Sequence, residues 1–238
     1  MRILITNDDG IMADGIIRLT EAALKYGDVW VVAPESQRSA ASHAITLRDP
    51  IDVFPYPNFP VKGVTAWSCS GTPADCVRVG SLNLMPERPE VVLSGINYGY
   101  NAATDIQYSG TLGAAFEAAF QGYHAIAFSE SADPCHETAD RYLDEMLREA
   151  LDVKLDYGQV VNINFPHGSL DDCKGIKRGC SVSRGMFYKD RYKQARQRED
   201  GGFELMVDGI WTAVGEDGTD LKAIIDGYVA VGIVNNIK

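Results

Sequence analysis

The feature of this sequence that most constrains its fold is a regular alternation of strand-like and helix-like segments, which begins at the first residues. The apolar run RILIT occupies residues 2–6, a helical pattern lies near 15–25, and the run DVWVVAP covers 28–34. Parallel strands are joined by a crossover connection, usually a helix, so this order predicts a βαβ unit. The alternation continues with strand-like runs at 64–70, 90–96, 124–130 and 159–166, and helical patterns near 72–82, 112–122 and 136–151.

The pattern changes after Pro166. Glycines then punctuate short polar and aromatic runs, which is typical of hairpins rather than of βα units. A helix followed by a strand is predicted at 219–234. We therefore expect an α/β fold with an open, mostly parallel sheet in a core of residues 1–166. A β-rich extension would form 167–238, and part of it would return to the core or to a partner subunit. In such sheets ligands bind at the carboxyl ends of the strands.

Composition and missing motifs exclude several classes of function. The formal net charge of −11 would repel nucleic-acid backbones and anionic membranes. The sequence has no apolar run of about 18 residues and no N-terminal signal segment, and its 5 cysteines form no C-x-x-C pair. We therefore expect a soluble, cytoplasmic protein with reduced thiols. The signature motifs of Rossmann dinucleotide sites, P-loops, zincins and serine hydrolases do not occur.

The first predicted strand ends in two adjacent carboxylates, Asp8 and Asp9, within the segment ITNDDG. Successive strand residues point to opposite faces, but Gly10 makes it easy for the chain to leave the strand here, so both side chains can serve one site. Two carboxylates without a nearby Cys or His suit a hard cation such as Mg²⁺ or Mn²⁺ rather than zinc. A plain turn is the alternative, since Asn-Asp-Asp-Gly is rich in turn formers. The position at a strand's carboxyl end favours a site.

A second strand end carries the polar segment PESQRSAASHAIT at 34–46, which includes Ser39, Ser42 and His43. A serine hydroxyl can complete the oxygen shell of a hard metal ion. An ordinary polar loop explains the same segment equally well.

A third strand end, at 93–111, combines regularly spaced polar residues with the start of a helix. It contains Asn97, Asn101 and Asp105 at intervals of four residues, followed by Ser109, Gly110 and Thr111. Free backbone N–H groups at a helix N-terminus form a natural phosphate seat. The alternative is that Ser109 is a plain N-cap and that the asparagines are loop formers. The two interpretations are compatible.

The stretch MFYKDRYKQARQR at 186–198 places basic residues among aromatic ones, against the acidic trend of the chain. It predicts either a solvated or intersubunit arm, or a segment that contacts a polyanion or a nucleotide.

These segments resemble the SurE family of survival-protein phosphatases and nucleotidases, and the resemblance covers nearly the whole chain. It rests on the motifs ILITNDDG (3–10), VVAPESQRSAASHAIT (31–46), SGTPADCV (70–77), SGINYGYN (94–101) and TDIQYSGTLGAA (104–115), which are followed by VNINFP (161–166) and DGYVAV (226–231).

The resemblance implies a Rossmann-like core with helices on both faces of the sheet, and a C-terminal extension used to form a homodimer or homotetramer. It also implies one divalent metal ion, Mg or Mn, that is essential for hydrolysis. Its ligands would be Asp8, Asp9, Ser39 and Asn97. The same comparison places Asn101 and Asp105 in the catalytic pocket and places the phosphate at Ser109, Gly110 and Thr111.

The family's substrates imply hydrolysis of nucleoside monophosphates, 5′ and often also 3′, with no stable nucleic-acid partner and no membrane. One departure leaves alternatives open. Many members end their last strand in Thr-Pro-Leu with an active-site His soon after, whereas this chain has VGIVNNIK, with Asn235 near that place. The alternatives are an exopolyphosphatase or broad phosphatase, or a nucleotide-binding protein with weakened turnover because this His is absent.

Overall fold

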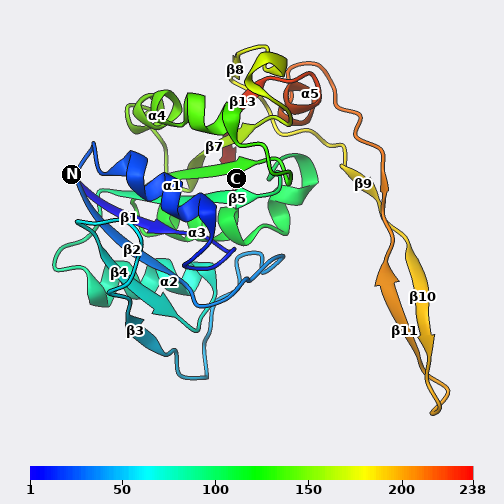
Figure 1. Ribbon diagram of the computed structural model, residues 1–238, viewed down its shortest axis with the longest axis horizontal. Helices are drawn as coiled ribbons and strands as arrows, with labels where there is room; N and C mark the ends of the chain where they lie inside the picture. Colours follow the sequence, from blue (N-terminus) through cyan, green and yellow to red (C-terminus); the bar gives the residue numbers. More distant parts are fainter. Residues whose placement is uncertain (238) are drawn as a thin grey trace.

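The structure, a computed structural model, describes residues 1–237. Within them a 9-stranded sheet has the strand order β3-β4-β2-β1-β5-β6-β7-β13-β8 (Figure 1). Its central strands are β4 (Thr65–Cys69), β2 (Asp28–Pro34), β1 (Arg2–Thr6), β5 (Val91–Tyr98), β6 (His124–Glu130) and β7 (Gln159–Phe165), each parallel to its neighbour. The α/β fold class with a mostly parallel sheet is therefore confirmed.

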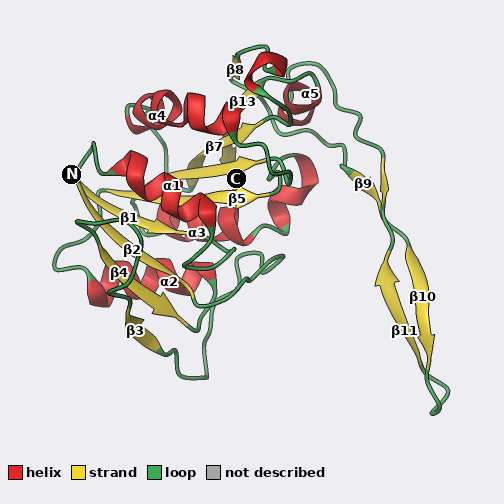
Figure 2. Ribbon diagram, viewed as in Figure 1, coloured by secondary structure: helices red, strands yellow, loops and turns green. Residues whose placement is uncertain are grey.

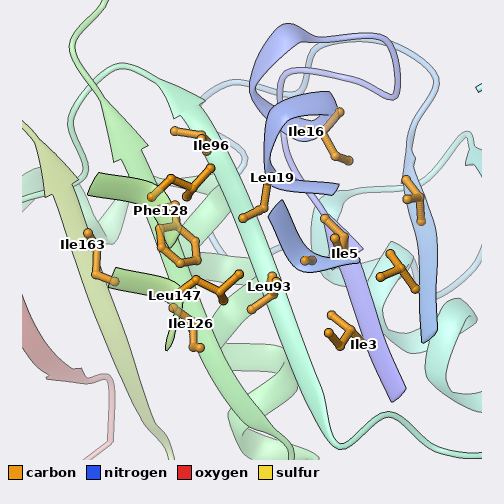
Figure 3. Packing of buried hydrophobic residues seen from close by; sticks show 14 of the residues in the cluster. Ile3, Ile5, Ile16, Leu19, Leu93, Ile96, Ile126, Phe128, Leu147 and Ile163 are labelled. Atoms are coloured by element: carbon orange, nitrogen blue, oxygen red, sulfur yellow. The ribbon is translucent and has the colours of Figure 1, made fainter. Parts of the chain in front are cut away.

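Helices cover both faces of the sheet (Figure 2). They are α1 (Asp14–Ala23) and α4 (Glu137–Leu151) on one face, and α2 (Pro73–Val79) and α3 (Gly110–Phe120) on the other. Successive side chains of β1 point to opposite faces of the sheet and pack against these two layers of helices. Ile3 and Ile5 belong to the same buried cluster as Ile16 of α1 and Leu147 of α4 (Figure 3), whereas Leu4 between them belongs to the cluster on the opposite face.

Local sequence signals position the helix starts. Thr72 caps α2, because its side chain accepts from the N–H of Asp75 while the Asp75 carboxylate accepts from the N–H of Thr72. The prediction of one helix over 72–82 is only partly right: α2 ends at Val79, and a π-helical turn, Gly80–Leu84, follows. A Cβ at Gly80 would lie 3.0 Å from Leu4 Cδ1, so the turn packs tightly against β1.

Two short elements were not predicted. Strand β3 (Val53–Pro55) pairs antiparallel with β4 at the edge of the sheet, and its three residues include a proline. A 3₁₀ turn, η2 (Ala103–Gln107), lies inside the predicted Gly/Asn-rich loop. Both elements are too short for a periodic sequence pattern to show them.

Hairpins form after Pro166, as the sequence predicts. The pairs β9 (Tyr188–Lys189) with β12 (Ile210–Trp211), and β10 (Tyr192–Gln197) with β11 (Phe203–Val207), are antiparallel. Together they form an arm that points away from the body (Figure 1). The rest of the extension returns to the main sheet. Strand β13 (Val229–Asn235), which follows α5 (Asp220–Ile225), pairs antiparallel with β7 and parallel with β8 (Ile176–Arg178).

The order of the strands determines where a ligand can bind. From β1 the chain adds β2 and β4 on one side and then crosses to add β5, β6 and β7 on the other. A crevice forms outside the carboxyl ends of the strands at such a switch point, here between β1 and β5. In residues 1–237 no helix has both the length and the apolar character needed to span a bilayer.

Candidate functional site

A cavity of about 320 Å³ opens at the carboxyl ends of β1 and β5, at the switch point. It brings together most of the predicted site residues. Those that line it are Asp8, Ser39, Asn97, Asn101, Asp105 and Ser109. Asp9, Gly110 and Thr111 do not line it; Asp9 follows Asp8 directly, and the other two contact or closely approach Asp8.

Asp8 is the buried centre of the site. Its side chain is held at the start of α3, where the Thr111 hydroxyl donates to Asp8 Oδ1 over 2.6 Å. Burial, reinforced by the charge of Asp9, raises the pKa of Asp8 to about 6, although hydrogen bonds from Thr111 oppose this rise. A side chain at Gly110 would approach Asp8 Oδ2 to 3.0 Å, so only glycine fits there without displacing the carboxylate.

Asp9 and Asn97 are held by hydrogen bonds with neighbouring residues. Asp9 Oδ2 accepts from the N–H of Tyr98 over 2.9 Å, and Oδ1 accepts from Gln37 Nε2 over 3.3 Å. Burial also raises the pKa of Asp9. The Asn97 amide donates to the carbonyl of Gly99 over 2.7 Å, which fixes the side chain and leaves its carbonyl oxygen as an acceptor.

Backbone contacts tie the loop that carries Ser39 to both of its neighbours. On one side, the N–H of Arg38 donates to the carbonyl of Asp8 over 2.7 Å. On the other side, the N–H of Ser42 donates to the carbonyl of Tyr108 over 3.0 Å, just before α3 begins. The Ser39 hydroxyl is thereby carried to the same cavity as Asp8.

Side-chain contacts with α3 hold the far end of the same loop. His43 Nε2 lies 2.9 Å from Glu117 Oε2, and Arg78 binds the other oxygen of this carboxylate. Burial alone would raise the pKa of Glu117, but hydrogen bonds from His43, Gln121 and Arg78 outweigh it and lower the pKa to about 2. His43 therefore anchors the loop and does not line the cavity.

Asn101 and Asp105 differ in the hydrogen bonds that their side chains make within the chain. Asn101 is buried, and its Nδ2 donates to Ser129 Oγ over 2.9 Å, which leaves a second N–H hydrogen on the same nitrogen. The Asp105 carboxylate accepts no hydrogen bond from any residue in 1–237. Burial raises its pKa, and the negative charge of Asp190 adds to the effect. The Asp105 carboxylate is thus free to meet a ligand.

The start of α3 fits both interpretations of Ser109. Its hydroxyl caps the helix by accepting from the N–H of Leu112 over 3.0 Å. The residue also lines the cavity, beside backbone N–H groups at the helix start that have no partner within the helix. The Thr111 side chain does not line the cavity and instead donates to Asp8.

The cavity is acidic. Asp8, Asp105 and Asp190 line it, and none of its lining residues among those described is a lysine, arginine or histidine. No group of three or more His, Cys, Asp or Glu residues suited to a metal ion occurs within residues 1–237. The available set of two carboxylates, a hydroxyl and an amide carbonyl is oxygen-only, and such a set fits Mg²⁺ or Mn²⁺.

The C-terminal extension contributes residues that the sequence analysis did not assign to the site. Met186, Tyr188 and Asp190 line the cavity, and all three lie in the basic-aromatic stretch 186–198. The rest of that stretch forms the exposed arm. The stretch thus forms an exposed arm, and its first residues line the cavity, where its aromatic residues were the sequence signal for a contact.

Asn235 lies far from the cavity. In the antiparallel pair of β13 and β7 it is opposite Gln159, the first residue of β7. The cavity lies at the opposite ends of the strands, where Asn164 near the end of β7 accepts a hydrogen bond from the N–H of Asn101. A histidine at position 235 would therefore lie away from this chain's own cavity.

Comparisons with known proteins extend over nearly the whole chain. A family model described as survival protein SurE matches residues 3–189. A protein of Thermosipho melanesiensis named 5′-nucleotidase SurE is 39% identical over 239 residues, covering 97% of this chain and 90% of the relative. A protein of the same name from Clostridium botulinum is 40% identical, covering 97% and 91%. The fold is similar to the crystal structure of the SurE protein from Aquifex aeolicus, with a TM-score of 0.81 and 30% identity over 99% of this chain and 93% of that one.

Proposed function

The chain belongs to the SurE family, and from that premise we propose that it hydrolyses nucleoside 5′-monophosphates with the help of one divalent metal ion. It is a phosphoric monoester hydrolase of the 5′-nucleotidase type, as its relatives are named. We further propose that the metal ion is Mg²⁺ or Mn²⁺ and that the chain also acts on 3′-monophosphates.

The observation that carries the metal requirement is the acidity of the cavity. Three aspartates line it, and no basic side chain among the described lining residues opposes them. Two unit charges about 4 Å apart interact by roughly 4 kcal/mol at an effective dielectric constant of about 20. A phosphate dianion would therefore be repelled from this cavity unless a cation is bound first.

We assign the metal ion to the carboxylates of Asp8 and Asp9, the hydroxyl of Ser39 and the amide carbonyl of Asn97. When bound there, the ion would polarise a phosphoryl oxygen and lower the pKa of a water molecule. The raised pKa values of both carboxylates support this assignment, because they mark buried negative charge that the protein alone does not balance.

The remaining residues would act on the phosphate and on a proton. The N–H groups at the start of α3, from Ser109, Gly110 and Thr111, would bind the phosphate, and the free N–H hydrogen of Asn101 would stabilise its developing charge. Asp105 would exchange a proton with the water or with the leaving oxygen. Its raised pKa and unpaired carboxylate support that role.

The test is hydrolysis of AMP and of p-nitrophenyl phosphate, measured with Mn²⁺, with Mg²⁺ and in EDTA. We expect turnover with metal, none in EDTA, and none for Asp8→Asn, whereas the exposed control Asp49→Asn keeps full activity. Undiminished turnover in EDTA would refute the metal requirement. The same assay with 3′-AMP and with short polyphosphate decides between a 5′-nucleotidase and a broader phosphatase or exopolyphosphatase.

We also infer that the arm holds a homodimer or homotetramer together. All residues of β10 and β11 are exposed, including Tyr192, Phe203 and Leu205. An isolated two-stranded hairpin is only marginally stable in water. Arg191 and Asp208 are hydrogen-bonded at the base of the hairpin, so 192–207 can be replaced by two glycines. If the mass in solution does not fall in that variant, the arm is not the subunit interface.

A further inference from the structure

A second cavity, of about 600 Å³, adjoins the acidic one at the base of the arm. Tyr100, Asp105 and Tyr188 line both cavities, so a single ligand can extend from one into the other. Small-molecule sites typically enclose about 300–1,000 Å³. The second cavity is therefore large enough for a substantial part of a ligand whose phosphate lies beside Asp8.

Aromatic rings form one wall of this second cavity. Tyr100 stacks on Phe187 with ring centroids 5.6 Å apart, and Phe187 packs against Trp211 at 5.4 Å. Tyr188 meets the edge of Trp211 at 5.2 Å. Four rings, from the loop after β5, from β9 and the residue before it, and from β12, thus form one connected group.

This aromatic group is anchored at one end and open at the other. Phe187 is buried in a cluster with Leu221 of α5 and Ala103 of η2. In contrast, Trp211 is 53% exposed and Tyr188 is 48% exposed. Both rings contact other aromatic rings, line the cavity and are about half exposed, so part of their surface is open for a planar ligand to stack on.

We propose that the second cavity binds the nucleobase of the substrate on Trp211 and Tyr188, and that it favours purines over pyrimidines. The proposal rests on the proposed function of the acidic cavity. A nucleoside monophosphate places its base on the far side of the ribose from its phosphate, which matches the order of the two cavities. A bicyclic purine covers more of the indole and phenol faces than a pyrimidine does, so it gains more from stacking.

The polar groups of the cavity fit the same ligand. Ser131 and His167 line the wall formed by the segments that follow β6 and β7, and His167 Nδ1 lies 2.5 Å from Asp133 Oδ2. These groups can meet the ring nitrogens and exocyclic groups of a base at its edge, while the aromatic side chains meet its face.

The experiment compares substrates with and without a base. We would measure kcat/KM for AMP, CMP and ribose 5-phosphate with the wild type, Trp211→Ala, Trp211→Phe and the distant control Trp67→Phe. The wild type should prefer AMP to CMP. In Trp211→Ala the ratio of kcat/KM for AMP to that for ribose 5-phosphate should fall about tenfold, the size expected for one lost base-stacking contact. Trp211→Phe should keep most of the ratio, and Trp67→Phe all of it.

Two outcomes overturn the proposal. An unchanged ratio in Trp211→Ala would show that the indole does not contact the base. An equal loss on both substrates together with a lower mass in solution would show that a second copy of this chain covers Trp211. If the wild type hydrolyses neither AMP nor ribose 5-phosphate, the proposed function fails, and adenosine then tests the base site alone. Adenosine should quench the fluorescence of the wild type but not of Trp211→Phe, and absence of this quenching overturns the base site.

Discussion

Replacing Asp8 by asparagine should stabilise the metal-free protein while it removes activity. Asp8 is 4% exposed, and its pKa is raised from 3.8 to about 6. At about 1.36 kcal/mol for each pH unit, this difference means that the ionised carboxylate costs the fold about 3 kcal/mol at pH 8. Asparagine has the same shape and can still accept the hydrogen bond from Thr111, but it carries no charge.

The sign of the pH dependence follows from the raised pKa. The folded state binds a proton on Asp8 more tightly than the unfolded state does, so the wild type gains stability as the pH falls from above 6 toward 3.8. Asp8→Asn lacks this gain. The stability advantage of the variant should therefore be largest at pH 8, at up to about 3 kcal/mol, and should vanish near pH 4. Part of it will be lost because the new Nδ2 needs an acceptor.

Urea unfolding followed by circular dichroism in EDTA, at pH 8, 6 and 4.5, measures this advantage. In thermal unfolding of a chain of 238 residues, each kcal/mol of added stability should raise the Tm by about 2–4 °C. The exposed control Asp49→Asn should stay within about 0.5 kcal/mol of the wild type. Added Mn²⁺ should raise the Tm of the wild type but not of Asp8→Asn. If the variant is no more stable than the wild type at pH 8 in EDTA, the carboxylate is not strained by burial and the reasoning is refuted.

Three further predictions concern the surroundings of the site. Gly110→Ala should lower kcat/KM at least tenfold with an unchanged circular dichroism spectrum, because the new Cβ would lie 2.9 Å from Asp8 Cβ. Glu117→Gln should destabilise the fold by roughly 2 kcal/mol at pH 7 in urea unfolding, a figure reduced because the Arg78 side chain is 44% exposed. Since the Glu117 pKa is lowered from 4.5 to about 2, this loss should shrink as the pH falls through that range. Asn235→His should leave kcat/KM unchanged, because the residue lies at the end of β13 that is far from the cavity. A tenfold rise in kcat/KM would show that the tail of another subunit completes the site.

The periodic part of the fold could be predicted from the sequence because each strand and helix repeats its burial pattern several times. In β1 the alternation of Ile3, Leu4 and Ile5 alone assigns each side chain to one of two helical layers. The π-turn after Val79 could not be predicted, because no local pattern marks it and its first residue, Gly80, packs against Leu4, which is far away in the chain.

The candidate site could be predicted as a set of residues but not as a geometry. Position at strand ends pointed to Asp8 and left Ser39 and Asn97 open, and the family resemblance added these two; all three line one cavity. It could not show that Thr111 binds Asp8, since that hydrogen bond joins residues 103 positions apart. Strand-end position also could not show that Tyr188 lines both cavities, because this residue lies in the basic-aromatic stretch 186–198 and not at the end of a core strand. Contacts of this kind depend on the register of the whole sheet, which no local pattern contains.

Helix α3 explains how such distant segments form one site before any metal ion binds. Its first turn holds Asp8 through Thr111, and Glu117, two turns later, holds His43 at the end of the loop that carries Ser39. Between these two contacts, a side chain at Gly113 would lie 2.0 Å from the Ser42 carbonyl, so the loop rests directly on the helix backbone. One rigid helix thus holds both Asp8 and the loop that carries Ser39 before the metal ion binds. Because the ion then has to order little of the chain, less of its binding free energy is spent on ordering and its affinity is higher.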